Sequence, residues 1–180
     1  MIANMNHDEF ICELKDRVCH SDWHKRYYAK RARKFNSRDY WLKAMIGIIA
    51  AIGALMAGTN HFRVFGACVA GLCGFVLGSI LPNFKWDSIV SGINEEREEW
   101  TRIFQGYEGV LRMWQILDRD EMIGQEYKKV EEMQKASALN DRGLPEDEKL
   151  LKEIGKEVAN YWSKKWGETV NPPFEDESEK

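Results

Sequence analysis

The segment "FGACVAGLCGFVLGSILP", residues 65–82, decides between two folds for this chain. No charged residue occurs from position 64 to position 81, and about eighteen apolar residues in a row are typical of a transmembrane helix. Four glycines in this run would each weaken a helix in water by roughly 1 kcal/mol, whereas glycine is common in membrane helices. The alternative is a glycine-rich core helix of a soluble protein. The sequence favours the membrane span.

Small residues recur every four positions along this segment, at Gly66, Ala70, Gly74 and Gly78. This pattern lets two helix backbones approach closely in lipid, so we expect it to form a helix-packing face. A second face holds Cys68, Leu72, Phe75 and Ser79, followed by Asn83. In an oligomer this face could line a pore that its Phe and Leu side chains close by dewetting. Alternatively, the same side chains face lipid or protein.

A second apolar segment, "WLKAMIGIIAAIGALMAG" at residues 41–58, lies just upstream. Its uninterrupted part from Ala44 to Gly58 covers only about 22 Å at 1.5 Å per residue. The flanking residues, including the aliphatic stem of Lys43, can extend it. Because only "TNHFR" separates the two segments, we expect a tight transmembrane hairpin, with spans at about 41–58 and 64–81.

The distribution of basic residues predicts the orientation of this hairpin. Residues 1–43 contain ten Lys or Arg, whereas the connecting loop contains only Arg63. Positive charge stays on the cytoplasmic side of a membrane. We therefore expect both termini in the cytoplasm.

Residues 1–40 predict a basic, amphipathic cytoplasmic helix that contains "KRYYAKRARKF". Mixed aromatic and basic side chains can bind a nucleotide or a short oligonucleotide, and beside a membrane they can also attract anionic lipid headgroups. Near the other end, "YWSKKWGE" places two lysines between tryptophans. The candidate ligand-binding residues are therefore Lys30, Arg31, Arg33, Lys34, Lys164 and Lys165.

Residues 82–118 show an aromatic heptad pattern typical of a coiled-coil seam. The seam consists of Trp86, Val90, Ile93, Trp100, Phe104, Tyr107, Leu111 and Trp114. Two interpretations are equally open. The seam joins copies of the chain in an oligomeric bundle, or it packs on the chain's own helices.

A C-terminal helical region at 119–170 and an acidic tail at 171–180 complete the chain. The expected fold is an all-α membrane protein, with a two-helix hairpin and long cytoplasmic helices that form an oligomeric helical bundle. The sequence contains no catalytic or metal-binding motif at recognisable spacing. We therefore expect neither enzymatic activity nor a cofactor or metal ion.

Residues 8–117, with a basic helix running into a tight hairpin and then a long helix containing "EEREEW", resemble the SLATT family of bacterial two-transmembrane effectors. This resemblance implies a pore-forming effector of anti-phage defence in the bacterial inner membrane. It further implies control by a nucleotide or oligonucleotide and a nucleotidyltransferase partner. Two spans cannot enclose a channel, so the chain must self-associate, and we expect a closed tetramer.

Two other functions remain open at this stage. A non-conducting membrane scaffold would dock a cytoplasmic partner through the aromatic heptads. A phage holin would kill the cell at the time of lysis and would need no nucleotide partner.

Overall fold

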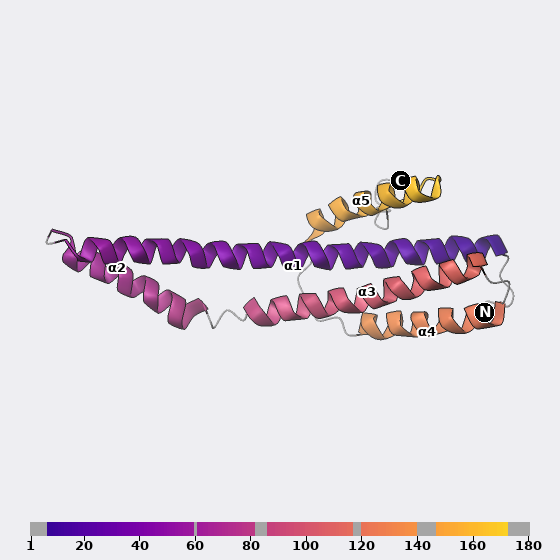
Figure 1. Ribbon diagram of the computed structural model, residues 1–180, viewed down its shortest axis with the longest axis horizontal. Coiled ribbons are helices and arrows are strands. Elements are labelled where there is room, and N and C mark those ends of the chain that lie inside the picture. Colours follow the sequence, from indigo (N-terminus) through magenta and orange to yellow (C-terminus); the bar gives the residue numbers. More distant parts are fainter. Residues whose placement is uncertain (1–6, 60, 82–85, 117–119, 140–146, 173–180) are drawn as a thin grey trace. The chain divides into compact units, whose positions relative to one another are not determined.

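The computed structural model describes residues 7–59, 61–81, 86–116, 120–139 and 147–172. Within these ranges the chain contains helices and turns and no strand. The helices are α1 (His7–Ala57), α2 (Arg63–Phe75), the π-helix η2 (Val76–Ile80), α3 (Trp86–Ile116), α4 (Asp120–Leu139) and α5 (Glu148–Trp166) (Figure 1). Two compact units result, the bundle (residues 1–31 and 92–180) and the hairpin (residues 32–91).

α1 runs unbroken for 51 residues and contributes to both units. The sequence has no glycine or proline from His7 to Ile46, so nothing interrupts the ladder of backbone hydrogen bonds. The helix therefore passes without a break through residues 40 and 41, where the basic helix was expected to meet the first span.

The bundle is built around a core that all four of its helices supply. α1 contributes Phe10, Leu14, Val18, Trp23 and Tyr27, and α3 contributes residues of the heptad pattern. α4 adds Ile123, Tyr127 and Val130, and α5 adds Leu151, Ile154, Val158 and Trp162. Apart from the five-residue step from Val18 to Trp23, these positions recur at spacings of three and four, which gives each helix one apolar face toward the others.

Local signals fix the ends and the packing of the bundle helices. Asp147 caps α5 because its side chain accepts a hydrogen bond from the Leu150 N–H at 3.2 Å. Gly167 ends α5 in the left-handed region, at φ 71°, where glycine is favoured. Gly106 lets α3 approach α4, since a Cβ there would lie 2.6 Å from Val130 Cγ2.

The hairpin consists of the second part of α1, a short turn, α2, η2 and the first residues of α3. Gly58 N–H donates to the Leu55 carbonyl and Thr59 N–H to the Met56 carbonyl, which closes α1 before the turn. Both helices are long and apolar enough to cross a membrane. The described residues thus confirm two parts of the expected fold, the all-helical structure and the two apolar candidate spans.

Candidate functional site

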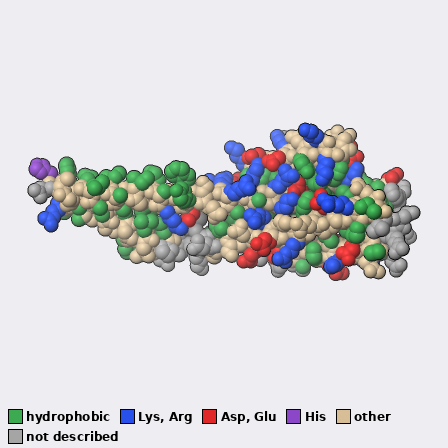
Figure 2. All heavy atoms as spheres, viewed as in Figure 1, with side chains coloured by type: hydrophobic (Ala, Val, Ile, Leu, Met, Phe, Trp, Pro, Cys, Tyr) green, Lys and Arg blue, Asp and Glu red, His purple; other side chains and the backbone are tan. Residues whose placement is uncertain are grey.

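Large apolar side chains of the hairpin are exposed in the described structure. Only 6% of the apolar window of α1 and 11% of that of α2 are buried. The exposed set is Tyr40, Trp41, Leu42, Met45, Ile48, Ile49, Ile52, Leu55, Phe62, Val64, Phe65, Leu72, Phe75 and Ile80. Figure 2 shows hydrophobic side chains gathered over the hairpin, while charged side chains dominate the bundle surface. The hairpin therefore presents a largely apolar surface.

α1 and α2 approach most closely where two glycines face each other. A Cβ on Gly66 would lie 2.3 Å from the backbone nitrogen of Ala57 and 2.5 Å from the carbonyl oxygen of Gly53. A Cβ on Gly53 would lie 2.9 Å from the backbone nitrogen of Ala70. Such distances leave room for hydrogen only, so both glycines are required for this packing. Gly53 did not enter the sequence pattern because the expected run of small residues was confined to the second span.

Within one chain, α2 packs on α1 through the first part of the expected run, and Gly74 and Gly78 do not take part in this contact. A Cβ at either position would meet nothing within 4 Å, whereas Cys73 is buried. The reason is the helical repeat. At 3.6 residues per turn, each step of four residues turns the face by about 40°, so Gly78 lies about 120° from Gly66. The face toward α1 therefore continues from Ala70 to Cys73.

The predicted pore face is exposed along its described length. Cys68 and Ser79 are exposed, and Leu72 and Phe75 are 67% and 60% exposed. Asn83 lies outside the described residues. Cys68 and Leu72 also border an apolar groove of about 430 Å³, which Ile46 and Ile49 of α1 line from the other side.

A π-helix, absent from the sequence-based expectation, ends the second span. η2 covers Val76–Ile80 and contains Ser79. Pro82 lacks the N–H that would continue an α-helical ladder to Gly78, a signal that points to an irregular helix end. Short π-helical turns occur frequently at functional sites, and this one alters the backbone beside the predicted pore face.

The aromatic heptads of α3 lie in the core of the bundle. Ile93, Trp100, Tyr107 and Leu111 are buried, and Phe104 and Trp114 pack against the same core. Val90 is half-buried in the hairpin, and the side chain of Trp86 lies outside the description. In this structure the seam therefore packs on the chain's own helices, which is one of the two interpretations left open by the sequence.

Two histidines of α1 take part in this aromatic core. The His24 ring stacks on Trp100, with centroids 3.8 Å apart and planes 8° apart, and His20 contacts both rings. Burial, followed by the proximity of His20, lowers the pKa of His24 to about 2. Burial and the charge of Arg17 lower the pKa of His20. Both imidazoles are thus held neutral.

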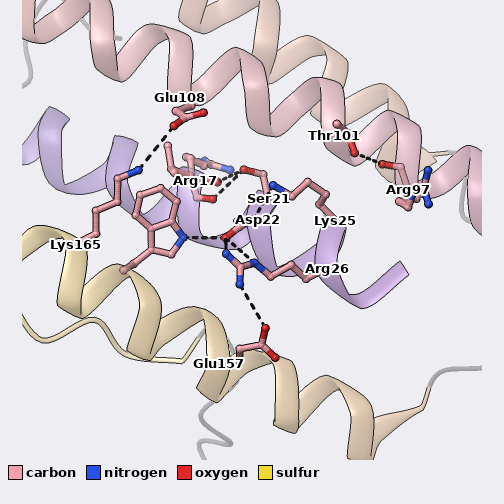
Figure 3. Close-up of polar contacts among 12 residues, drawn as sticks. Arg17, Ser21, Asp22, Lys25, Arg26, Arg97, Thr101, Glu108, Glu157 and Lys165 are labelled. Atoms are coloured by element: carbon pink, nitrogen blue, oxygen red, sulfur yellow. Dashed lines mark hydrogen bonds and ion pairs between the residues drawn. The ribbon is translucent and has the colours of Figure 1, made fainter. Parts of the chain in front are cut away.

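A buried carboxylate on α1 joins α5 to the bundle (Figure 3). Asp22 is 1% exposed, and its Oδ2 accepts hydrogen bonds from Trp162 Nε1 at 3.1 Å and Arg26 Nε at 3.0 Å. Its Oδ1 lies 2.8 Å from Lys25 Nζ. Arg26 Nη1 also reaches Glu157 of α5 at 3.4 Å. Asp22 therefore lies at the centre of a polar network that attaches α5 to α1.

The basic residues predicted to bind a ligand fall into different environments. Lys30 Nζ pairs with Glu157 at 2.6 Å and Glu153 at 3.3 Å. Arg31 is buried, and its Nη1 donates to Tyr27 Oη at 3.3 Å. Arg33 and Lys34 are exposed. Two of the four cations are thus engaged in the bundle interior or with α5.

The second predicted set lies at the C-terminal end of α5. Lys164 is exposed, and Lys165 Nζ lies 3.8 Å from Glu108 Oε1 and 4.4 Å from the centroid of the Trp162 ring. The Glu153 and Glu157 carboxylates that hold Lys30 lie two to three turns earlier on the same helix. The two predicted sets therefore do not form one basic pocket.

A mixed groove of about 670 Å³ lies elsewhere on the bundle. Its lining includes Lys15, Arg17 and His20 of α1, Gln134 of α4, and Trp166 and Glu168 at the end of α5. Lys15 Nζ pairs with Glu168 at 2.5 Å and lies 5.3 Å from the Trp166 ring centroid. Opposite charges therefore face each other within the groove.

Comparisons with protein-family models, with curated proteins and with solved structures find no match for this chain. Within the described residues, no three His, Cys, Asp or Glu side chains come together as a metal site.

Proposed function

We propose that this chain is a homo-oligomeric channel of the bacterial inner membrane, gated through its cytoplasmic bundle. The observation that carries the proposal is the exposed apolar surface of the hairpin. A core helix of a soluble protein would be mostly buried, whereas both candidate spans are almost entirely exposed within their own unit.

The energetic scale supports lipid as the solvent of this surface. Each large apolar side chain gains roughly 1.5–3 kcal/mol when it leaves water. Summed over the exposed set of the hairpin, the cost of keeping these side chains in water rather than in lipid is on the order of 20 kcal/mol. A bilayer removes this cost.

Conduction requires several copies of the hairpin, because two helices cannot enclose a channel. The exposed face with Leu72 and Phe75 is available to meet its equivalents around a shared axis. A ring of these side chains would close the pore by dewetting, with Ser79 in the π-helix beside it. A tetramer with closed symmetry is the arrangement that we propose.

The remaining parts of the proposal follow from charge and from the family resemblance. The basic residues before the first span favour a cytoplasmic location for both termini. The resemblance to SLATT effectors suggests an anti-phage effector that a nucleotide or oligonucleotide controls and that acts with a nucleotidyltransferase. Arg33, Lys34 and Lys164, three of the six predicted ligand-binding cations, have exposed side chains.

Burial of the aromatic heptads favours the channel over the scaffold. A scaffold that docks a partner through this seam needs the side chains of Trp100 and Tyr107 on the surface. These side chains are 6% and 0% exposed. The surface on which the scaffold depends is therefore occupied by the chain's own helices.

The test compares Phe75→Ala with Leu55→Ala in cells that express the full chain. Both positions are exposed apolar residues of the hairpin, but Leu55 lies on α1, away from the proposed gate. Removing the Phe75 ring widens the constriction, so we expect Phe75→Ala to depolarise the membrane and slow growth. A potential-sensitive dye reports the depolarisation.

Reconstituted vesicles provide the second measurement. Phe75→Ala should increase ion leak at least about ten-fold over the unmodified chain, because a dewetted apolar ring is the barrier that the substitution removes. Leu55→Ala should leave the leak unchanged. Equal leak from all three proteins, with intact membrane potential in cells, would overturn the channel proposal.

A further inference from the structure

The apolar surface of the hairpin is short for a membrane protein. Exposed apolar side chains on α1 extend from Trp41 to Leu55, about 21 Å along the helix at 1.5 Å per residue. On α2 and η2 they extend from Val64 to Ile80, about 24 Å by the same rise. The hydrocarbon core of a typical bilayer is about 30 Å thick. The hairpin is therefore several Å shorter than the bilayer that it would cross.

Polar and aromatic side chains fix the first end of this surface. Lys43 Nζ pairs with Asp39 at 2.6 Å, one turn nearer the N-terminus, so its ammonium is directed away from the apolar run. The exposed rings of Tyr40 and Trp41 lie between these two charges along the helix. Charged groups avoid the hydrocarbon core, and Trp and Tyr prefer its boundary. The boundary therefore lies close to Trp41.

The second end is fixed at the turn of the hairpin. Thr59, His61 and Arg63 are exposed there, and Phe62 is 55% exposed beside them. α1 already ends at Ala57, so no further helical turn is available to lengthen the span. From Trp41 to Ala57 the helix rises about 24 Å. Both ends thus restrict the apolar height to roughly this value.

We propose that the hairpin is matched to a thin bilayer, with a hydrocarbon core of about 24 Å, and that it prefers lipids with short acyl chains. This inference rests on the membrane location in the proposed function. In a thicker bilayer a short span thins the lipid around it or associates with other copies. Thickness therefore acts on the same self-association that the proposed channel needs.

Competition between lipids tests the preference in the full chain. The protein is reconstituted in phosphatidylcholine with brominated eighteen-carbon chains, which quench tryptophan fluorescence, mixed with unbrominated competitors of fourteen, eighteen or twenty-two carbons. Trp41 reports the contact, and a parallel measurement on Trp41→Phe is subtracted to remove the other tryptophans. The fourteen-carbon competitor should relieve quenching with a relative affinity at least about two-fold above the eighteen-carbon lipid.

A longer hairpin provides the matched test. Arg38→Leu with Asp39→Leu replaces the two charges before Tyr40 and extends the apolar run back from Trp41 to residue 38, about 4.5 Å at 1.5 Å per residue, so the preference should shift toward eighteen carbons. Asp39→Asn alone keeps Arg38 and should retain the preference for short chains. An unchanged preference in the double variant would contradict the boundary that we place near Trp41.

The possible results separate the two proposals. If all competitors reduce the quenching of Trp41 equally, or if the twenty-two-carbon lipid reduces it most, the thickness inference is overturned. Quenching of Trp41 by brominated lipid would still support insertion in the membrane. If brominated lipid does not quench Trp41 and the protein does not float with vesicles, the membrane location itself fails. Preference for fourteen carbons supports both.

Discussion

At the scale of single residues, His24 is an imidazole that the fold keeps neutral. Its ring stacks on Trp100, and burial lowers its pKa to about 2. An unfolded histidine titrates near 6.5, so below that pH the unfolded state binds the proton and the folded state does not. The free energy of unfolding should therefore be highest above about pH 6.5 and fall by up to about 1.4 kcal/mol per pH unit below it.

His24→Phe tests this dependence because phenylalanine preserves a flat ring against Trp100. Thermal unfolding followed by near-ultraviolet circular dichroism, in detergent at pH 7.5 and 5.5, measures the change. The drop in thermal stability from pH 7.5 to pH 5.5 should be smaller in the variant than in the unmodified chain. Part of the drop should persist, because the pKa of His20 is also lowered. The same pH dependence in both proteins would mean that His24 contributes nothing to it.

Asp22 presents a different case, a buried carboxylate that contacts Lys25, Arg26 and Trp162. Removing one member of a buried pair costs about 3–5 kcal/mol, but Lys25 and Arg26 are each 27% exposed and regain water. We expect Asp22→Ala to destabilise the attachment of α5 by about 2 kcal/mol. Hydrogen exchange of residues 148–166 should accelerate accordingly.

Glu157→Gln is the control for Asp22→Ala because it alters the exposed edge of the same network. Glu157 is 45% exposed, and surface ion pairs contribute about 0–1 kcal/mol. Exchange in α5 should change little in this variant. If both variants accelerate exchange equally, the buried carboxylate has no special role.

The basic stretch shows what the sequence alone reveals about individual residues. Its composition predicted four equivalent cations, but Lys30 and Arg31 engage Glu153, Glu157 and Tyr27. The two carboxylates lie more than 120 residues away along the chain. Which lysines and arginines remain exposed depends on this long-range packing, which the local sequence does not encode.

At the scale of elements, the contact between α1 and α2 depends on glycine. Gly66→Ala would place a Cβ 2.3 Å from a backbone nitrogen, and backbone cannot move aside as a side chain can. The expected cost of about 1–3 kcal/mol from overpacking exceeds the gain of about 1 kcal/mol in helix propensity. The hairpin should therefore open.

Cys73 reports this opening because its side chain is only 8% exposed in α2. In detergent, Gly66→Ala should increase its reaction rate with a maleimide several-fold. Gly74→Ala, at a position with nothing within 4 Å, is the matched control and should leave the rate unchanged. A similar rate in both variants would contradict the packing of α2 through Gly66.

Hydrophobic periodicity predicted where the helices lie more accurately than it predicted which of their faces pack together. The heptads of α3 gave the buried face correctly, since Trp100, Tyr107 and Leu111 all lie in the core. Spacing of four residues in α2 drifts around a helix of 3.6 residues per turn, so within one chain only the first part of the expected run faces α1. The π-helix at Val76–Ile80 depends on the detailed backbone near Pro82, which a pattern of apolar residues does not specify.

At the scale of the whole molecule, α1 contributes to an apolar unit and to a polar one. α1 supplies both the first candidate span and the stripe from Phe10 to Tyr27 in the bundle core. Composition separated these two parts correctly, because charged residues are concentrated outside residues 44–58 and 64–81. The joining of α4 and α5 to α1 was not predictable, since contacts such as Asp22 with Trp162 connect distant positions.

The orientation of the molecule is tested by comparing two cysteines in spheroplasts. Native Cys12 is exposed in the bundle, and Thr59→Cys adds a thiol at the exposed turn of the hairpin. Because the basic residues lie before the first span, a membrane-impermeant maleimide should label Thr59→Cys in intact spheroplasts. Cys12 should react only after lysis. Labelling of Cys12 before lysis would place the bundle outside the cytoplasm. If neither site is labelled before lysis, the turn lies on the same side as the bundle, and the hairpin does not cross the membrane.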